Sequence, residues 1–396
     1  MTPRKHQEEG AAWALKTIRE YGLAYLSWQE RTGKTLTALL TAENSKAETC
    51  LIVTKKRAID GWLETLDLWS HKTKFQVINY ESAHKVTGKF DFVILDESHH
   101  AISSVGKPSK TWKTIHRHTK GKAILYLSAT PYAEHVGLIY HQLKLSDWSP
   151  FKGYKNFYDW FRMYGVPNMT RTPYGLVETY TKYKDELVLK SIDELFNFKT
   201  RTEVGIEHEP EANVVVVPLC NSSIALIKQL QKDSVVEIPM EEPIVCDTPM
   251  KERSVHYQIE GGTIKIEGGK GYVRVCTEKL DYIRSNYDEG SIAIMAHFIA
   301  ERIILAEAFP KALILSSDGH AEGVDLHKTE KLIVYSMSFK TSKHTQRLAR
   351  QANHKRDKPI IVDVLVSDKP GIGLEVFKSV AIKKENFDKN SYERVR

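Results

Sequence analysis

Three short segments in the N-terminal third of the chain carry side chains suited to binding and cleaving a nucleoside triphosphate. The first, Trp28–Thr35, follows an apolar run and ends in Gly33-Lys34-Thr35. Where such a loop opens a helix, its backbone N–H groups cradle phosphate, the lysine reaches the β- and γ-oxygens, and the threonine hydroxyl binds Mg²⁺. An ordinary turn with a buried lysine stem is the alternative, because Trp28 stands where the full phosphate-loop pattern begins with glycine. The candidate nucleotide-binding residues here are Arg31, Thr32, Gly33, Lys34 and Thr35.

The second segment is a pair of adjacent carboxylates, Asp96 and Glu97, at the end of the apolar run Phe92–Leu95. The carboxyl end of a strand in a parallel sheet lines the ligand crevice. We expect Asp96 to bind Mg²⁺ opposite Thr35, and Glu97 to accept a proton from the attacking water. A solvated pair beside a helix-capping Ser98 is the alternative, but the upstream Gly-Lys-Thr favours catalysis.

The third segment is Ser128-Ala129-Thr130-Pro131, which follows the next β-rich run. The hydroxyls of Ser128 and Thr130 are placed where they can sense the γ-phosphate and donate hydrogen bonds to the acidic segment. The alternative is that they cap the helix expected after Pro131. We therefore assign Ser128 and Thr130 a coupling role.

The elements that must position these residues form an α/β pattern. Strands are predicted at 23–28, 50–54, 75–78, 90–95 and 123–127, and helices at 7–21, 34–42, 58–69 and 111–116. Strands joined by helical crossovers predict a parallel sheet with helices on both faces. A second series of strands follows at 214–217, 292–296, 312–316, 331–335 and 360–365, with helices expected at 298–308 and 345–352.

Two tandem lobes are therefore predicted. The first covers residues 1–205 and includes an irregular or helical extension at 145–200. The second covers residues 206–396 and includes a β-meander at about 255–275, with short strands at 255–259, 263–266 and 272–275 between glycine doublets.

The composition excludes several classes of protein. A hydrophobic fraction of 41% and a charged fraction of 27% are typical of a globular chain. No apolar run approaches the ~18 residues of a membrane span, and the N-terminus lacks the apolar core of a signal peptide. The four cysteines are widely separated, and the adjacent His99 and His100 have no evident third partner, so we assign neither a disulfide framework nor a zinc site. We expect a cytoplasmic protein without a membrane partner.

Positive charge is concentrated in two stretches of a chain whose net charge is +7. Residues 107–122 contain six Lys or Arg and no acidic residue, and residues 340–396 contain 14 Lys or Arg against 7 Asp or Glu. Clustered basic residues predict a polyanionic partner. The alternative is a solvated basic helix face. The candidate nucleic-acid contacts are Lys107, Lys110, Lys113, Arg117 and Arg356.

In this order and spacing, Gly33-Lys34-Thr35, Asp96-Glu97-Ser98-His99 and Ser128-Ala129-Thr130-Pro131 resemble motifs I, II and III of the superfamily 2 helicases. The chain is most similar to the Swi/Snf-type ATPases, in the compact form found in phages. Arg4–Gln7 resembles the N-terminal motif whose glutamine contacts adenine, which makes Gln7 a candidate ATP contact. Leu51–Thr54 followed by Trp62 resembles motif Ia, and Val77–Glu81 resembles motif Ib. One departure is Arg31, where many relatives have glycine.

The resemblance extends into the second lobe. Residues 317–326 resemble motif V, which implies that Gly323 and Asp325 lie at the nucleotide. Residues 346–350 resemble motif VI, which implies coupling by Gln346, nucleotide binding by Arg347 and an arginine finger at Arg350. The family usually has a further arginine where this chain has Asn353. We expect Arg350 to carry the finger role and Arg356, a helical turn beyond Asn353, to contact DNA.

Two RecA-like lobes with an ATP cleft between them are the fold that the resemblance implies. The implied function is an ATP-dependent DNA helicase or translocase of replication, recombination or repair, with ATP and Mg²⁺ as cofactors. DNA (duplex, forked or branched) is the expected partner rather than RNA, in the host cytoplasm if the chain is phage-encoded. Two alternatives stay open: a motor subunit of a restriction or repair assembly, and a nucleic-acid-binding module with weak ATPase activity.

Overall fold

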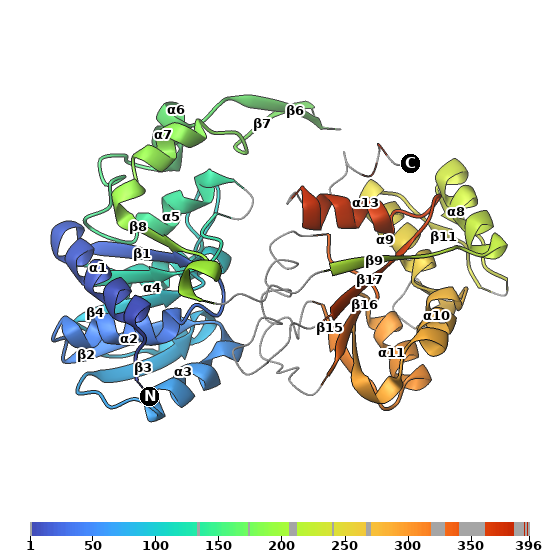
Figure 1. Ribbon diagram of the computed structural model, residues 1–396. Helices are drawn as coiled ribbons and strands as arrows, with labels where there is room; N and C mark the ends of the chain where they lie inside the picture. The colour runs from blue at the N-terminus through green and yellow to red at the C-terminus, as the bar shows by residue number, and fades with distance from the viewer. Residues whose placement is uncertain are drawn as a thin grey trace. The chain divides into compact units, whose positions relative to one another are not determined.

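The structure is a computed structural model that describes residues 2–132, 135–172, 175–205, 212–239, 241–266, 271–317, 329–339 and 361–383, together with 392 and 394. The chain divides into two compact units, Met1–Glu207 and His208–Arg396 (Figure 1). Each unit is an α/β lobe built on a parallel sheet, which confirms the predicted fold class. No helix within the described ranges is long and apolar enough to cross a membrane.

The first lobe is a six-stranded sheet in the order β3-β2-β4-β5-β1-β8, and each neighbouring pair of strands is parallel. Its strands are β1 (Leu23–Trp28), β2 (Thr49–Thr54), β3 (Lys74–Asn79), β4 (Phe92–Asp96), β5 (Ala123–Leu127) and β8 (Phe196–Lys199). The connecting helices are α1 (Lys5–Tyr21), α2 (Lys34–Asn44), α3 (Ile59–Asp67) and α4 (Lys110–Thr119).

Both faces of this sheet are buried at its central strands, because β2, β4 and β5 are apolar at nearly every position rather than at alternate ones. Leu51, Val53 and Val93 belong to the core on one face, whereas Ile52 and Ile94 belong to the core on the other. Continuous apolar runs of this kind are typical of parallel strands covered on both sides. The order β4-β5-β1 brings the ends of the acidic strand, the Ser128 strand and the phosphate-loop strand next to one another.

The extension predicted as irregular or helical ends in a strand of the main sheet, which corrects the sequence-based prediction. Helix α5 (Ile139–Leu143) precedes it, and it contains α6 (Phe157–Tyr164), a hairpin of β6 (Asn168–Thr172) and β7 (Gly175–Thr179), and α7 (Asp185–Lys190). Its last element, β8, pairs in parallel with β1. Phe196 stacks on Tyr25 with ring centroids 4.5 Å apart, so aromatic packing holds this short strand at the edge of the sheet.

The second lobe is a five-stranded parallel sheet in the order β15-β14-β16-β17-β9. Its strands are β9 (Ala212–Val217), β14 (Ile292–Ala296), β15 (Leu313–Ser316), β16 (Lys331–Val334) and β17 (Ile361–Ser367). The helices are α8 (Asn221–Asp233), α9 (Pro249–Glu260), α10 (Glu278–Asn286), α11 (Ile299–Ala308) and α13 (Gly373–Phe377). Two short pairs complete the lobe, β10 (Val235–Val236) with β11 (Ile244–Val245), and β12 (Thr263–Lys265) with β13 (Tyr272–Arg274).

One of the three strands predicted in the meander at 255–275 is wrong. Residues 255–259 lie in helix α9, and only β12 and β13 form a hairpin. The alternation of Val255, Tyr257 and Ile259 suggested a strand, yet all residues from Val255 to Glu260 are buried, so no one-sided helical pattern could appear. The helix begins where Thr248 accepts a hydrogen bond from the N–H of Lys251, with Pro249 in the first turn.

Candidate active site

The loop between β1 and α2 has the backbone of a phosphate-binding turn. Gly33 has φ 91° at the N-cap of α2, and Arg31 has φ 64°. A Cβ on Gly33 would lie 2.2 Å from Nε2 of Gln7, so this position requires glycine both for its conformation and for its space. The loop therefore turns sharply and presents the N-terminus of α2, where backbone N–H groups are free of helical partners.

Lys34 turns its ammonium group back onto this loop. Its Nζ donates hydrogen bonds to the carbonyl oxygens of Trp28 at 2.6 Å and Gln29 at 2.9 Å. These oxygens hold the cation at the mouth of the loop, where a phosphate oxygen can replace them with a stronger, charge-assisted bond. Thr35 follows in the first turn of α2 and is half-buried.

Helix α1 braces the loop through the predicted adenine contact. Gln7 is buried, and its Nε2 donates to the carbonyl oxygen of Gly33 at 3.1 Å. One ring nitrogen of His6 lies 2.9 Å from the carbonyl oxygen of Thr32. The structure thus places Gln7 against the phosphate loop.

Strand β8 holds the other side of the loop. The N–H of Gln29 donates to the carbonyl oxygen of Lys199 at 2.9 Å, and the N–H of Arg201 donates to Oε1 of Gln29 at 2.7 Å. A cavity of about 380 Å³ opens beside this junction at the ends of β1, β5 and β8. Its lining residues are Ser27, Gln29, Ala129, Thr130, Pro131, Tyr132, Phe198, Lys199 and Thr200.

Asp96, the last residue of β4, is held in place by two hydrogen bonds to one carboxylate oxygen. The Thr54 hydroxyl donates to Oδ2 at 2.6 Å, and the indole Nε1 of Trp62 donates to the same atom at 3.1 Å. Thr54 ends the neighbouring strand β2, and Trp62 lies on α3. The Asp96 carboxylate therefore keeps a fixed orientation at the carboxyl end of β4.

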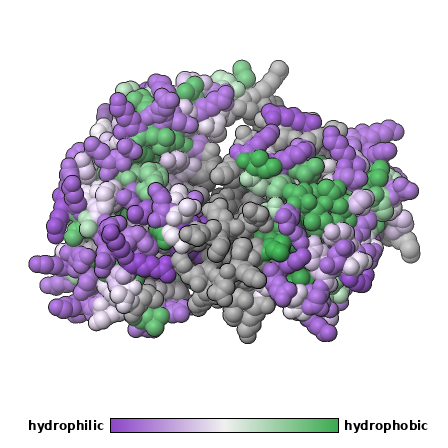
Figure 2. All heavy atoms as spheres, in the orientation of Figure 1, coloured by the Kyte–Doolittle hydropathy of each residue, from purple (hydrophilic) through white to green (hydrophobic). Residues whose placement is uncertain are grey.

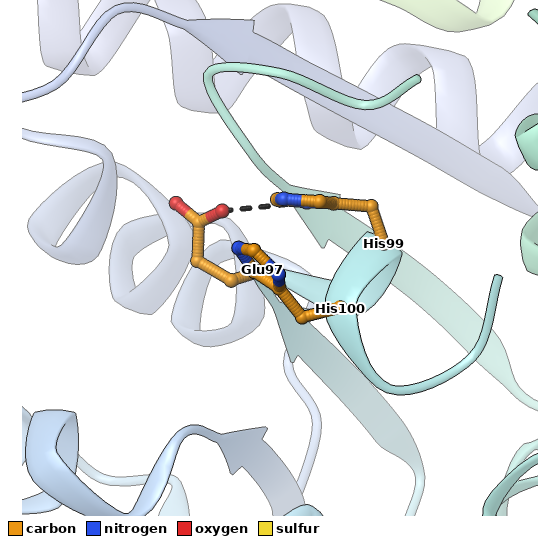
Figure 3. Close-up of side chains that lie close together, drawn as sticks. All are labelled: Glu97, His99 and His100. Carbon is orange, nitrogen blue, oxygen red and sulfur yellow. Dashed lines mark ion pairs between the residues drawn. The ribbon is translucent and has the colours of Figure 1, made fainter. Parts of the chain in front are cut away.

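Glu97 leaves the strand in a left-handed conformation, with φ 51°, and its side chain turns toward motif III. The Ser128 hydroxyl donates to Oε2 of Glu97 at 3.1 Å and lies 2.9 Å from Nδ1 of His99. Nδ1 of His99 is itself 3.4 Å from the same Glu97 oxygen (Figure 3). The structure therefore joins Glu97, Ser128 and His99 in one polar cluster, to which the N–H of Thr130 adds a bond to the Ser128 oxygen at 3.0 Å.

The environment of Glu97 suits a proton acceptor. Burial, and secondly the negative charge of Asp96, raise the pKa of Glu97 to about 7, although Lys55 and Lys34 oppose this rise. A carboxyl group with such a pKa is a stronger base than an ordinary glutamate, and about half of it is ionised at neutral pH. Burial also lowers the pKa of His99, whose side chain is only 5% exposed, so this imidazole is neutral.

These residues fit ATP and Mg²⁺. The Thr35 hydroxyl and the Asp96 carboxylate are hard oxygen donors of the kind that Mg²⁺ prefers. After burial, repulsion by Asp96 is the second cause of the raised pKa of Glu97, and a bound cation would relieve this repulsion further than Lys55 and Lys34 do. Lys34 and the N-terminus of α2 offer the complementary positive charge for phosphate.

Part of the predicted site lies outside the described residues. Gly323, Asp325, Gln346, Arg347, Arg350 and Arg356 all fall in the undescribed stretches 318–328 and 340–360, as does Asn353. Of the predicted motif V, the structure describes Ser317, which is buried and lies 3.1 Å from a ring nitrogen of His297.

The predicted nucleic-acid contacts in the first lobe lie at the surface. Lys107 is exposed in the loop before α4. Lys110, Lys113 and Arg117 are exposed on α4, three and four positions apart, so they share one helix face. We name these three residues the α4 basic face.

Sequence reasoning missed three contributors to the site. Gln142 on α5 is fully buried and accepts hydrogen bonds from Ser98 at 2.7 Å and Tyr25 at 3.0 Å, so it holds the turn that follows Glu97. Gln29 links the phosphate loop to β8. The contact between Trp62 and Asp96 spans 34 positions. The resemblance to motif Ia had pointed to Thr54 and Trp62 without their contact to Asp96, Gln29 directly follows a predicted strand, and the sequence carried no signal for Gln142.

Comparisons with known proteins find one matching family model and several similar solved structures. Residues 68–133 match the family model described as "Type III restriction enzyme, res subunit", a range that contains Asp96, Glu97 and Ser128. No curated protein matches the sequence. The chain is similar to the SWI2/SNF2 ATPase core of Sulfolobus solfataricus in complex with dsDNA, with a TM-score of 0.44 and 14% identity over 100% of this chain and 93% of that chain.

A second similar structure is the Hef helicase domain of Pyrococcus furiosus, with a TM-score of 0.48 and 12% identity over 93% of this chain and 96% of that chain. The family match supports the resemblance of the first-lobe motifs to superfamily 2 helicases. A phage source has no support among these matches.

Proposed function

We propose that this chain, whose motifs and two-lobed fold are those of a superfamily 2 helicase core, hydrolyses ATP with Mg²⁺ and uses that hydrolysis to move on DNA. One observation carries the proposal. The order β4-β5-β1 puts Asp96 and Glu97, Ser128, and the Lys34 loop at adjacent strand ends of one sheet. Cation, carboxylates and hydroxyl thus stand together where a parallel sheet binds its ligand.

Each group has a distinct task in the proposed reaction. Lys34 and the N-terminus of α2 hold the β- and γ-phosphates, while Thr35 and Asp96 hold Mg²⁺, which neutralises phosphate charge when bound. Glu97 accepts the proton of the attacking water, because its pKa of about 7 suits proton transfer at neutral pH. Ser128, bonded to Glu97, passes the state of the catalytic carboxylate to the loop that continues to Thr130. Arg350 supplies the cation from the second lobe.

The DNA part of the proposal rests on charge. The α4 basic face carries three cations on one exposed helix surface, and the chain has a net charge of +7. Such a surface binds phosphates without reading bases, as a translocating motor requires. The family match favours one alternative, a motor subunit of a restriction assembly, because the matching family is described by a restriction-enzyme subunit.

ATPase rates with no nucleic acid and with single-stranded, duplex, forked and four-way DNA, or with RNA, test the proposal. We expect hydrolysis that DNA stimulates and that Lys34→Ala abolishes. Glu97→Gln should retain ATP binding but lose turnover, because the amide keeps the shape and loses the base. Hydrolysis equal with and without every nucleic acid would contradict the DNA-dependent motor, and normal hydrolysis by Lys34→Ala would contradict the site.

A further inference from the structure

Three side chains beside Ser128 have the residue types of a transition-metal site, a role that ATP hydrolysis does not use. One ligand atom from each of Glu97, His99 and His100 lies within 4.8 Å of the others (Figure 3). The left-handed Glu97 leads directly into a tight 3₁₀ turn at Ser98–His100, which brings the three side chains to one point. We propose that this cluster binds a divalent transition-metal ion such as Zn²⁺.

The spacing of the first two ligand atoms fits a metal without rearrangement. Oε2 of Glu97 and Nδ1 of His99 are 3.4 Å apart. Bonds of about 2.0–2.2 Å at a tetrahedral angle separate two zinc ligands by about 3.3–3.6 Å. No two of the three ligand atoms are more than 4.8 Å apart, so His100 needs to approach by at most roughly 1–1.5 Å to reach that distance. His100 is exposed, so a side-chain rotation can supply this movement.

The chemistry of the donors selects the ion. Two imidazoles and a carboxylate suit Zn²⁺, Co²⁺ and Ni²⁺, whereas Mg²⁺ prefers oxygen ligands alone. The Ser128 hydroxyl donates to Oε2 of Glu97 at 3.1 Å and can orient this carboxylate as an outer partner, while its contact with Nδ1 of His99 gives way to the metal bond. Three protein ligands leave a fourth position for water. The sequence argued against a metal because His99 and His100 lacked a third partner, and Glu97 supplies one.

A metal at this position would inhibit hydrolysis. Glu97 cannot accept a proton from water while its carboxylate is bonded to a cation. This consequence rests on the proposed function, whereas the binding of the ion does not. The competing interpretation is a simple hydrogen-bonded cluster, in which Nδ1–H of His99 donates to Glu97 and His100 takes no part.

Calorimetric titration of the metal-free full-length chain with ZnCl₂, in buffer containing Mg²⁺, separates the two. We expect one Zn²⁺ per chain and an affinity at least ~10-fold weaker in His100→Ala and in Glu97→Gln. His84→Ala is the matched control, because His84 is another exposed histidine of the same lobe, and its affinity should equal that of the parent. Equal affinities in the parent and His100→Ala would overturn the proposal.

The visible absorption spectrum of bound Co²⁺ distinguishes binding at this cluster from binding at the cysteines. We expect visible bands of nitrogen and oxygen coordination that weaken in His100→Ala. A thiolate-to-cobalt charge-transfer band instead would place the ion on cysteine and overturn the site.

A second experiment measures the inhibition of ATP hydrolysis by Zn²⁺, at a fixed excess of Mg²⁺, and compares each protein with its own rate without zinc. The Zn²⁺ concentration that halves the rate should rise in His100→Ala by the same factor by which the Zn²⁺ affinity falls. A chain that binds Zn²⁺ as described but never hydrolyses ATP would contradict the proposed function and leave the metal site standing. Undiminished hydrolysis by the zinc-bound parent would overturn the placement of the ion on Glu97.

Discussion

The indole Nε1 of Trp62 donates a hydrogen bond of 3.1 Å to Oδ2 of Asp96, the same oxygen that Thr54 binds at 2.6 Å. Trp62 comes from α3 and Thr54 from the end of β2, so two elements outside β4 fix the rotation of the carboxylate. Because the proposed Mg²⁺ site depends on that rotation, Trp62 is a positioning residue for the metal although it touches neither metal nor phosphate.

Trp62→Phe should therefore raise the Mg²⁺ concentration required for half-maximal ATPase activity by about 10-fold, the usual effect of losing an outer partner of a metal ligand. The measurement is a Mg²⁺ titration of the ATPase rate at constant free ATP. Trp112→Phe is the matched control, because its indole donates to the carbonyl oxygen of His141 instead. Equal Mg²⁺ requirements in the two variants would show that the Trp62 bond is only structural.

The ATPase activity should depend on the protonation of Glu97. Its pKa is raised to about 7, first by burial and then by the charge of Asp96. Only the ionised carboxylate accepts a proton, so kcat/KM should rise with pH and level off above about 7, falling about ten-fold per pH unit well below it. Rates between pH 5.5 and 8.5 check this, with far-UV circular dichroism to show that the fold persists. A flat profile across this range would remove Glu97 from the role of base.

Arg31 occupies a backbone conformation that favours glycine, with φ 64°. Arg31→Gly should keep ATP affinity close to that of the parent. Arg31→Val should weaken it by about 10-fold, because a β-branched residue avoids this conformation at a cost of about 1–2 kcal/mol. Fluorescent-nucleotide binding measures both. Lys46→Val is the control, because Lys46 has the same φ of 64° beyond the end of α2, and there ATP binding should not change.

The first-lobe sheet could be predicted because its information is local. β1 and β5 have the predicted bounds, since β5 is an apolar run throughout and β1 is interrupted only by Ser27. Asp96 follows such a run directly and Lys34 follows one after a short loop, so predicting the strands also predicted that both residues lie near strand ends. The predicted motif VI, and motif V beyond Ser317, lie in residues 318–328 and 340–360, outside the described residues.

What the sequence could not supply is contact between distant segments. β8 is four residues long and depends on the stacking of Phe196 on Tyr25, 171 positions apart in a chain that offers no local sign of it. Helix α9 is buried on every side of its last turns, so its periodicity was lost, although Thr248-Pro249 was a readable start signal. The contact between Glu97 and His99 depends on the left-handed backbone conformation of Glu97, and no residue type in this segment predicts that conformation.

Stability of the second lobe should fall as pH rises, because of buried acids. Burial raises the pKa of Glu301 to about 7. Hydrogen bonds from the Ser336 hydroxyl and the Phe298 N–H, and the nearby charge of Lys279, lower this pKa but do not cancel the effect of burial. The folded lobe keeps a proton on Glu301 that the unfolded chain releases above about pH 4.5. The contribution of Glu301 to the free energy of unfolding is therefore complete below about pH 4.5 and is lost as the pH rises to about 7. Glu301→Gln should remove up to ~3 kcal/mol of this pH dependence.

Urea unfolding at pH 5 and pH 8 tests this difference. All seven tryptophans lie in the first lobe, so a transition seen by circular dichroism but not by tryptophan fluorescence reports the second. Glu307→Gln is the control, since the Glu307 side chain is 56% exposed. Glu260, which is also buried with a pKa raised to about 7, should preserve part of the slope in Glu301→Gln. An unchanged slope in that variant would mean that Glu301 stays ionised in the folded lobe.

The α4 basic face should dominate the salt dependence of DNA binding if it contacts the phosphate backbone. Each lysine or arginine that neutralises a duplex phosphate contributes about −0.9 to the slope of log affinity against log salt. The triple variant Lys110→Gln, Lys113→Gln, Arg117→Gln should therefore reduce the magnitude of the slope by about 3, with a similar loss of affinity for every duplex sequence. Filter binding from 50 to 200 mM salt measures this slope.

The matched control removes Lys5, Lys16 and Arg19, three exposed cations of α1, and so changes the net charge equally. If the two triple variants lose the same slope, the effect is one of total charge and α4 is not the DNA surface; a loss confined to the α4 variant places the duplex on that helix.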